Sequence, residues 1–381
     1  MTISADHTTF DTPHDPLEKA RKYVLLLIDA DEIRSQRIAC VLTLAGMRAI
    51  VVTTIYQAFE RFLQERFTPS LILLGQQEEQ TKQLFGRFFQ RLTQELQREV
   101  PIMPLTNIKI SNGDLLAAYE TLSRTTHRVS HSNGSFLKRI WEILPGAECS
   151  FSTEEHTVAL EALPKIGLTP HVTRTKRSMA SHFHHQLKAA RQVIGYDQWD
   201  NLISDVGLAQ FRKEEHWPPL TNQYCIPPEY TTCLNRAVLF SNPEQPARQA
   251  YKWAGRVDSD ILQKVALIFL MQQAPKIIGQ DWNMRTLLTA FMNEANTTRG
   301  EKLTEWKRLD NGSFVFVFYS NMFAYGFMGA SGPSCYVWQA SFDKMLELGK
   351  IQNHWQVREI ECSCQTHTGH CVFLFTPNTA S

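Results

Sequence analysis

Three cysteines and a glutamate lie close together near the end of the chain, and side chains of these types bind soft divalent metals. They form the run Glu-Cys-Ser-Cys at positions 361–364, followed by Cys371. A single Zn²⁺ takes four thiolate, imidazole or carboxylate ligands in a tetrahedral arrangement. Cys335 is a further thiol that could complete the set, because it follows the turn-forming residues 332–334. The sequence therefore predicts a metal site in the C-terminal third of the chain.

The spacing alone leaves the choice of ligands open. In an extended strand Cys362 and Cys364 share one face and Glu361 lies on the other. Cys362 therefore competes with Glu361 as the fourth ligand, and His367 and His370 are further candidates. The chain begins without a charged and then apolar leader, so we expect a cytoplasmic protein in which disulfides are not favoured. The remaining four of the 8 cysteines fit small buried hydrophobes, and they are Cys40, Cys149, Cys225 and Cys233.

A helix should begin directly after Cys335. Trp338, Phe342 and Met345 recur at helical spacing, and Gly349 marks the end of the pattern. The N-terminus of a helix lowers the pKa of a nearby thiol, which favours the thiolate that binds metal. The predicted helix therefore presents Cys335 in a form suited to metal binding.

These motifs resemble the 4-vinyl-reductase domain, a ligand-binding module that also occurs in sensors of aromatic compounds. The resemblance rests on Gly-Pro-Ser-Cys ending at Cys335, the helix after it, Glu361-x-x-Cys364, and Gly-x-Cys-x-Phe around Cys371. It implies a structural zinc held by Cys335, Glu361, Cys364 and Cys371. The spacing between the last two cysteines is about one residue shorter than in some members, and Cys362 is an additional thiol.

The clearest strand of this region is rich in phenylalanine. Phe314, Phe316 and Phe318 alternate along it and share one face, after a tight turn at 310–312. Such a face either packs against helices as core or, with Phe323 and Trp338, lines an apolar pocket. The family resemblance implies that this pocket holds a small hydrophobic or aromatic ligand beside the metal.

The resemblance extends upstream, so we expect an α+β ligand-binding domain over 178–377. Its earlier part contains Asp205-Val206-Gly207-Leu208, a His-Trp-Pro-Pro run at 216–219 and a buried helix over about 259–273. A joint containing prolines and glycines should occupy 146–177, and its basic end at 174–177 fits a solvated surface.

The first third of the chain predicts a different domain over 21–145. Apolar strands at 23–28, 49–52, 71–74 and 102–106 alternate with helical segments, which is typical of a doubly wound parallel α/β sheet. This segment resembles a response-regulator receiver domain. The resemblance implies a phosphorylated aspartate after the third strand, an acidic pair for Mg²⁺ and a lysine.

The set of residues that receiver chemistry requires is incomplete in this chain. Gly75 stands where the aspartate is expected, and no lysine occurs near Ser130. Asp29 and Asp31 remain, and Thr106 occupies the place of the switch hydroxyl. We therefore expect a pseudoreceiver that forms no acyl phosphate.

Composition agrees with a folded chain of several domains and excludes some classes. The chain has 381 residues, 43% of them hydrophobic, and a net charge of +1. No stretch reaches the roughly 18 apolar residues of a membrane span, and no overall positive field favours nucleic acid. Residues 1–20, rich in polar side chains and proline, should form a disordered lead-in.

The combined hypothesis is a sensor that binds a small hydrophobic or aromatic ligand and signals through the pseudoreceiver to a protein partner. We expect a homodimer formed around residues 180–275. One alternative is a metal-containing enzyme of tetrapyrrole or aromatic metabolism, although four protein ligands would leave zinc no open position. A second alternative is a transcriptional regulator with a DNA-binding surface around 146–190.

Overall fold

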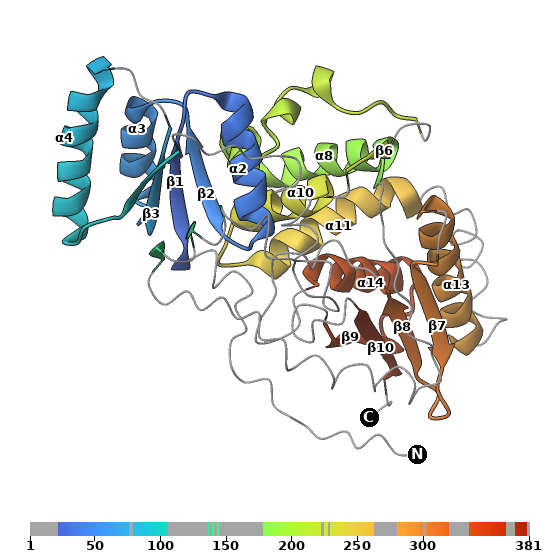
Figure 1. Cartoon of the computed structure of the whole chain (residues 1–381). Helices are drawn as coiled ribbons and strands as arrows, with labels where there is room; N and C mark the ends of the chain where they lie inside the picture. Colours follow the sequence, from blue (N-terminus) through green and yellow to red (C-terminus); the bar gives the residue numbers. More distant parts are fainter. Residues whose placement is uncertain are drawn as a thin grey trace.

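The computed structural model contains a parallel sheet near the N-terminus and an antiparallel sheet near the C-terminus, with helices between them (Figure 1). The structure describes residues 22–75, 79–105, 136, 139–140, 143–144, 178–221, 225–227, 229–262, 280–299, 302–319, 335–362 and 370–378. Several predictions fall outside these residues, namely the lead-in 1–20, the joint 146–177, Thr106, Ser130, Phe323, Cys364 and His367.

The N-terminal sheet is parallel, with strand order β2-β1-β3-β4. It consists of β1 (Val24–Ile28), β2 (Arg48–Val52), β3 (Leu71–Leu74) and β4 (Ile102–Pro104). Alternate residues of β1 enter two separate cores, with Leu25 and Leu27 on one face and Leu26 and Ile28 on the other. Burial on both faces explains why the strand is continuously apolar. The predicted parallel α/β sheet is confirmed.

Three described helices cover this sheet. They are α2 (Glu32–Leu44), α3 (Ile55–Glu65) and α4 (Glu79–Leu96). Helix α2 packs on one face, whereas α3 and α4 pack on the other. Asp31 caps α2 by accepting from the Arg34 amide, and Thr54 caps α3 in the same way.

The C-terminal sheet is antiparallel, with strand order β7-β8-β10-β9. It consists of β7 (Thr304–Arg308), β8 (Phe314–Phe318), β9 (Trp355–Glu361) and β10 (Cys371–Pro377). One face packs against α14 (Tyr336–Leu348) and α13 (Gln280–Arg299), because the phenylalanines of β8 point to that side. Gly312, with φ of 83°, permits the tight turn between β7 and β8.

A layer of helices joins the two sheets. It contains the short pair β5 (Ser178–Met179) and β6 (Cys225–Ile226), the helices α8 (Ala180–Ile194), α9 (Tyr196–Asp205), α10 (Glu229–Phe240) and α11 (Pro246–Leu262), and the 3₁₀ turns η2 (Ala209–Phe211) and η3 (Glu214–His216). One hydrophobic core includes Cys40 and Leu44 of α2, residues of α8–α11 and the phenylalanines of the C-terminal sheet. In Figure 1 this layer accordingly lies between α2 and α14.

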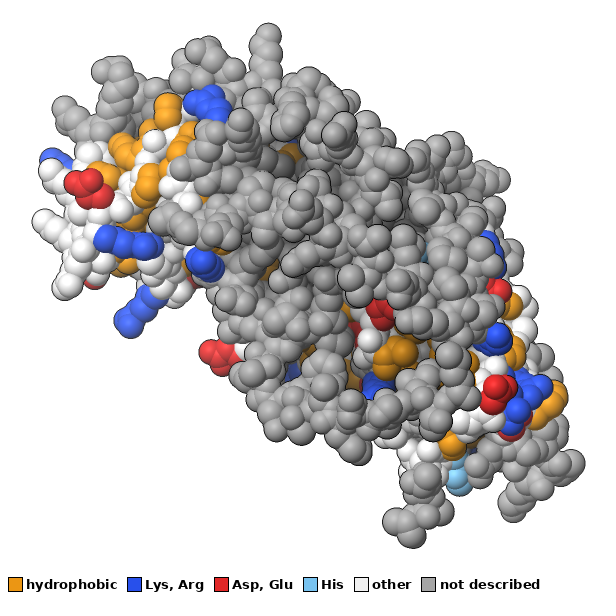
Figure 2. All heavy atoms as spheres, turned by 60° about the horizontal axis from the view of Figure 1, so that its bottom comes forward, with side chains coloured by type: hydrophobic (Ala, Val, Ile, Leu, Met, Phe, Trp, Pro, Cys, Tyr) orange, Lys and Arg blue, Asp and Glu red, His pale blue; other side chains and the backbone are white. Residues whose placement is uncertain are grey.

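Charges of both signs are mixed on the described surface. On the face in Figure 2, blue and red side chains lie side by side at one end. Ion pairs among the described residues include Arg308 with Asp281 and Lys302 with Glu305. None of the helices that the structure describes is both long and apolar enough to cross a membrane.

Candidate metal centre

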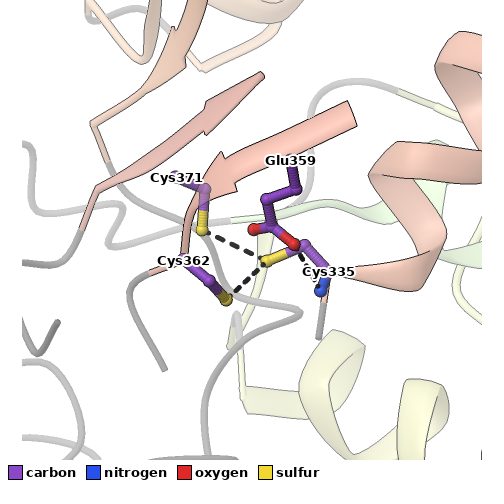
Figure 3. A group of neighbouring side chains, drawn as sticks. All are labelled: Cys335, Glu359, Cys362 and Cys371. Atoms are coloured by element: carbon purple, nitrogen blue, oxygen red, sulfur yellow. Dashed lines mark hydrogen bonds between the residues drawn. The ribbon is translucent and has the colours of Figure 1, made fainter. Parts of the chain in front are cut away.

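Four side chains from three elements meet at one end of the C-terminal sheet. Cys335, Glu359, Cys362 and Cys371 each offer a ligand atom, and these atoms all lie within 4.8 Å of one another. Figure 3 shows their side chains pointing toward a common centre. Three thiols and a carboxylate make a donor set suited to zinc.

The sulfur positions fit a shared ion better than a disulfide. Cys335 Sγ lies 3.1 Å from Cys371 Sγ and 3.4 Å from Cys362 Sγ. A disulfide requires about 2.05 Å, whereas two thiolates on one tetrahedral zinc, each about 2.3 Å from it, lie about 3.8 Å apart. Small outward movements of the side chains would therefore accommodate the ion.

A β-bulge explains why Glu359 and Cys362 point to the same side. Strand β9 pairs Glu359 with Phe373 but Glu361 with Val372, so Ile360 is an extra residue in the ladder. An extra residue reverses the alternation of side chains beyond it. Cys362 therefore joins Glu359 on the side that faces α14, while Ile360 stays 47% exposed.

The beginning of α14 supplies Cys335 and a backbone donor. Cys335 is the N-cap residue, and its amide N–H donates to Glu359 Oε2 at 3.1 Å. One turn later, Gln339 accepts from the Glu359 amide and donates to the Val357 carbonyl, which fastens α14 to β9. The positive end of the helix dipole therefore faces a cluster that becomes anionic when its thiols ionise.

Burial makes this cluster costly to ionise without a cation. The three cysteines are at most 2% exposed. Burial raises the pKa of Glu359 well above its usual range, and the neighbouring Cys362 raises it further. Burial likewise raises the pKa of Cys371. Among the described residues, Glu359 Oε1 has no hydrogen-bond partner. A bound divalent cation would satisfy this oxygen and favour the ionised ligands.

Some of the ligands predicted from the sequence belong to this cluster and others do not. Cys335 and Cys371 belong to the cluster, as does Cys362, which the sequence offered as a rival ligand. Glu361 is not among the four, because the bulge places it on the other side of the strand. The candidate ligand Cys364 lies outside the described residues.

Glu359 was missed, although the sequence carries a signal for it. Trp355, Val357 and Glu359 alternate along β9 and pair with Pro377, Phe375 and Phe373 of β10. A carboxylate in the third position of an inward-facing row needs a partner, and that requirement marks it as a candidate ligand. The other candidate, His370, is buried with its ring 5.6 Å from that of Tyr319.

The aromatic residues predicted to line a pocket form a dense group of rings. Phe314, Phe316 and Phe318 are fully buried. Trp338 stacks on Phe318 with ring centroids 4.3 Å apart, and Phe342 contacts both Phe316 and Phe318. These rings join β8 to α14 directly beside the thiol cluster.

The end of β3 contains no carboxylate, and its neighbour Asp29 is already paired. Arg34 donates from Nε to Asp29 Oδ2 at 2.6 Å and from Nη2 to Oδ1 at 2.7 Å. A Cβ atom at Gly75 would lie 2.2 Å from Asp29 Oδ1. The carboxylate of Asp29 thus occupies the space into which a side chain at position 75 would extend.

Comparison with protein-family models and with curated proteins found no match for this chain.

Proposed function

We propose that the chain is a sensor-type signalling protein whose C-terminal unit contains one structural zinc ion. The observation that supports this most directly is the convergence of Cys335, Glu359, Cys362 and Cys371, with one Glu359 oxygen lacking a hydrogen-bond partner among the described residues. Four protein ligands leave zinc no open position for a substrate. A stabilising role is therefore favoured over the alternative of a metalloenzyme.

The test compares two glutamates of the same strand. Full-length protein purified without chelators should contain about one zinc by elemental analysis. Glu359→Gln should weaken zinc binding, measured by competition with a chromophoric chelator, by more than the ~10–100-fold loss that follows removal of an outer-sphere partner. Glu361→Gln is the matched control and should bind as wild type does. Absence of metal, or an equal effect of the two substitutions, would contradict the proposed centre.

The N-terminal unit is proposed to act as an interaction module that accepts no phosphoryl group. The support is Gly75 at the end of β3 and the pairing of Asp29 with Arg34. A guanidinium that binds both carboxylate oxygens competes directly with Mg²⁺ for them. Incubation with acetyl phosphate and Mg²⁺ should leave the intact mass unchanged, and a base-labile adduct within residues 22–105 would contradict the proposal.

The proposed signal is a small hydrophobic or aromatic ligand bound in the C-terminal unit and transmitted through a homodimer. The family resemblance supports the ligand class, whereas the described rings of β8 pack directly against α14 as core. Native mass spectrometry of the purified chain should reveal a retained small molecule and a dimeric mass. A strictly monomeric chain that retains no such molecule would contradict the proposed signal and its transmission.

A further inference from the structure

A second group of thiols, which shares no residue with the candidate metal centre, lies where α2 packs against α10. Cys40 Sγ and Cys233 Sγ are 3.6 Å apart, although 193 positions separate them in the sequence. Cys40 is 6% exposed and Cys233 is fully buried. The pair therefore joins the N-terminal α/β unit to the helical layer.

The backbone around Cys40 is held by unusually close packing. Gly207, with φ of +80°, approaches α2 so closely that a Cβ there would lie 2.6 Å from both the Cys40 amide nitrogen and the Gln36 carbonyl oxygen. Gln36 also accepts from the Ala209 amide at 2.9 Å. Because only glycine fits this approach, the position of α2 relative to the layer that contains Cys233 is closely fixed.

We propose that Cys40 and Cys233 are a disulfide-forming pair that converts this contact into a covalent link. The sulfur separation of 3.6 Å exceeds a disulfide bond of about 2.05 Å, so closing the bond requires the two sulfur atoms to move toward each other. A hydroperoxide is the oxidant that the proposal requires. One thiolate displaces hydroxide from hydrogen peroxide to give a sulfenic acid, and the second thiolate attacks that sulfur and displaces a second hydroxide. Two thiols and one peroxide thus yield one disulfide and two waters.

Burial determines how fast the link forms. The hydrogen bond between the two thiols and burial both raise the pKa of Cys233, which disfavours the reactive thiolate in the closed structure. Oxidation must therefore wait for local opening of the contact between α2 and α10. The rate should rise in urea concentrations too low to unfold the chain.

The experiment treats the reduced, full-length, metal-loaded protein with hydrogen peroxide, then blocks remaining thiols in denaturant and maps peptides by mass spectrometry. The expected product is one peptide pair joined through Cys40 and Cys233, two hydrogens lighter than the reduced pair. The same oxidation in full denaturant is the control for chance pairing, and it should distribute the links among several of the 8 cysteines.

A control variant and two outcomes that would overturn the proposal complete the test. In the Cys233→Ala variant, Cys40 should be recovered without a disulfide partner. Because Cys233 is buried, the circular dichroism spectrum of this variant must match that of wild type to show that the variant is folded. Independently of any variant, the proposal is overturned if native wild type yields both cysteines fully alkylated when the denatured control is oxidised. It is also overturned if Cys40 joins other cysteines as often as in that control.

Discussion

At the scale of single residues, Asp29 determines what the end of the N-terminal sheet can do. Its side chain is 1% exposed, and it accepts from Arg34 and from the Asp31 amide. Its charge is therefore balanced by groups within ten residues of the same chain. Position 75 has no carboxylate, and the carboxylate of Asp29 is paired within the chain. Neither feature requires Mg²⁺ for charge balance.

Alanine substitutions at two glycines test this close approach. Gly75→Ala should destabilise the protein by about 1–3 kcal/mol, as for other overpacked sites, because the new methyl group would meet Asp29 Oδ1. Gly86→Ala is the matched control within α4, where a Cβ would meet nothing within 4 Å. It should stabilise the chain by about 0.5–1 kcal/mol, because alanine favours helix. Urea unfolding of both variants measures the difference, and equal stabilities would contradict the packing at Gly75.

At the scale of elements, the bulge in β9 accounts for the difference between the predicted ligand set and the cluster of side chains that the structure brings together. Strict alternation places Glu359 and Glu361 on the same face and Cys362 on the other, so it gives no reason to prefer Glu359 over Glu361. A bulge depends on pairing with a partner strand, here β10, and nothing local in the sequence around Ile360 indicates it. Cys335 and Cys371 were predicted as ligands and Cys362 was offered only as a rival to Glu361, whereas the choice of carboxylate depended on the register.

Helix α14 links the cluster of three thiols and Glu359 to the aromatic group. It begins at Cys335, and Trp338 stacks on Phe318 one turn later. Zinc removal should therefore loosen the first turn of α14 and expose Trp338. Chelator treatment should shift the tryptophan emission to longer wavelength in wild type and in Trp282→Phe, whose indole is already 48% exposed. Trp338→Phe should lose most of the shift, and retention of the full shift in that variant would place the metal-dependent change elsewhere.

Two acids on α14 should give pH effects of opposite sign. Burial raises the pKa of Asp343, so its folded-state pKa lies above the unfolded value of about 3.9. The stability that this acid contributes is therefore complete below about pH 4 and is lost as pH rises through the folded-state pKa. Asp343→Asn should accordingly be more stable than wild type at neutral pH, by a few tenths of a kcal/mol, and lose that advantage in acid.

Glu347 provides the opposite case on the same helix. Hydrogen bonds from Lys344 and Tyr251 lower its pKa. Its contribution is therefore present above the unfolded pKa of about 4.3 and is lost as pH falls through the lower folded value. Glu347→Gln should destabilise the chain at neutral pH by less than about 1 kcal/mol, because the group is largely exposed. Urea unfolding between pH 3 and pH 7 measures both variants, and parallel pH profiles would contradict the assignment.

At the scale of the whole molecule, the contact between the N-terminal sheet and the helical layer was beyond prediction from sequence. The apolar strands of the sheet were predictable because each carries its own pattern. Asp205, by contrast, is 144 residues from its partner Arg61, and no local pattern joins them. The sequence marks the run Asp205-Val206-Gly207-Leu208 as a motif. Its role follows from the structure, because α9 contacts β2.

Asp205 serves this contact through three hydrogen bonds. Its carboxylate accepts from Arg61 Nη1 and Nη2 at 2.7 and 2.8 Å and from the Val51 amide at 2.8 Å. Strand β2 lies at the edge of the described sheet, so the bond to Val51 satisfies an outward-facing N–H. Both charged groups are almost fully buried, Asp205 at 1% and Arg61 at 7% exposed.

Removing one member of this buried pair should make the N-terminal α/β unit less stable than the C-terminal unit. Asp205→Ala leaves the Arg61 charge without its main partner and should cost about 3–5 kcal/mol. Arg48→Ala breaks only the partly exposed pair of Arg48 with Glu65 and should cost less than about 1 kcal/mol.

Because one core runs from α2 into the helical layer, wild type should unfold in a single urea transition. Asp205→Ala should unfold in two, with the contact of α2 and α10 opening before the C-terminal unit. Hydrogen exchange should then accelerate in α2 and α9 while protection in β8 and β10 stays unchanged, and uniform acceleration across the chain would show that Asp205 contributes only to global stability.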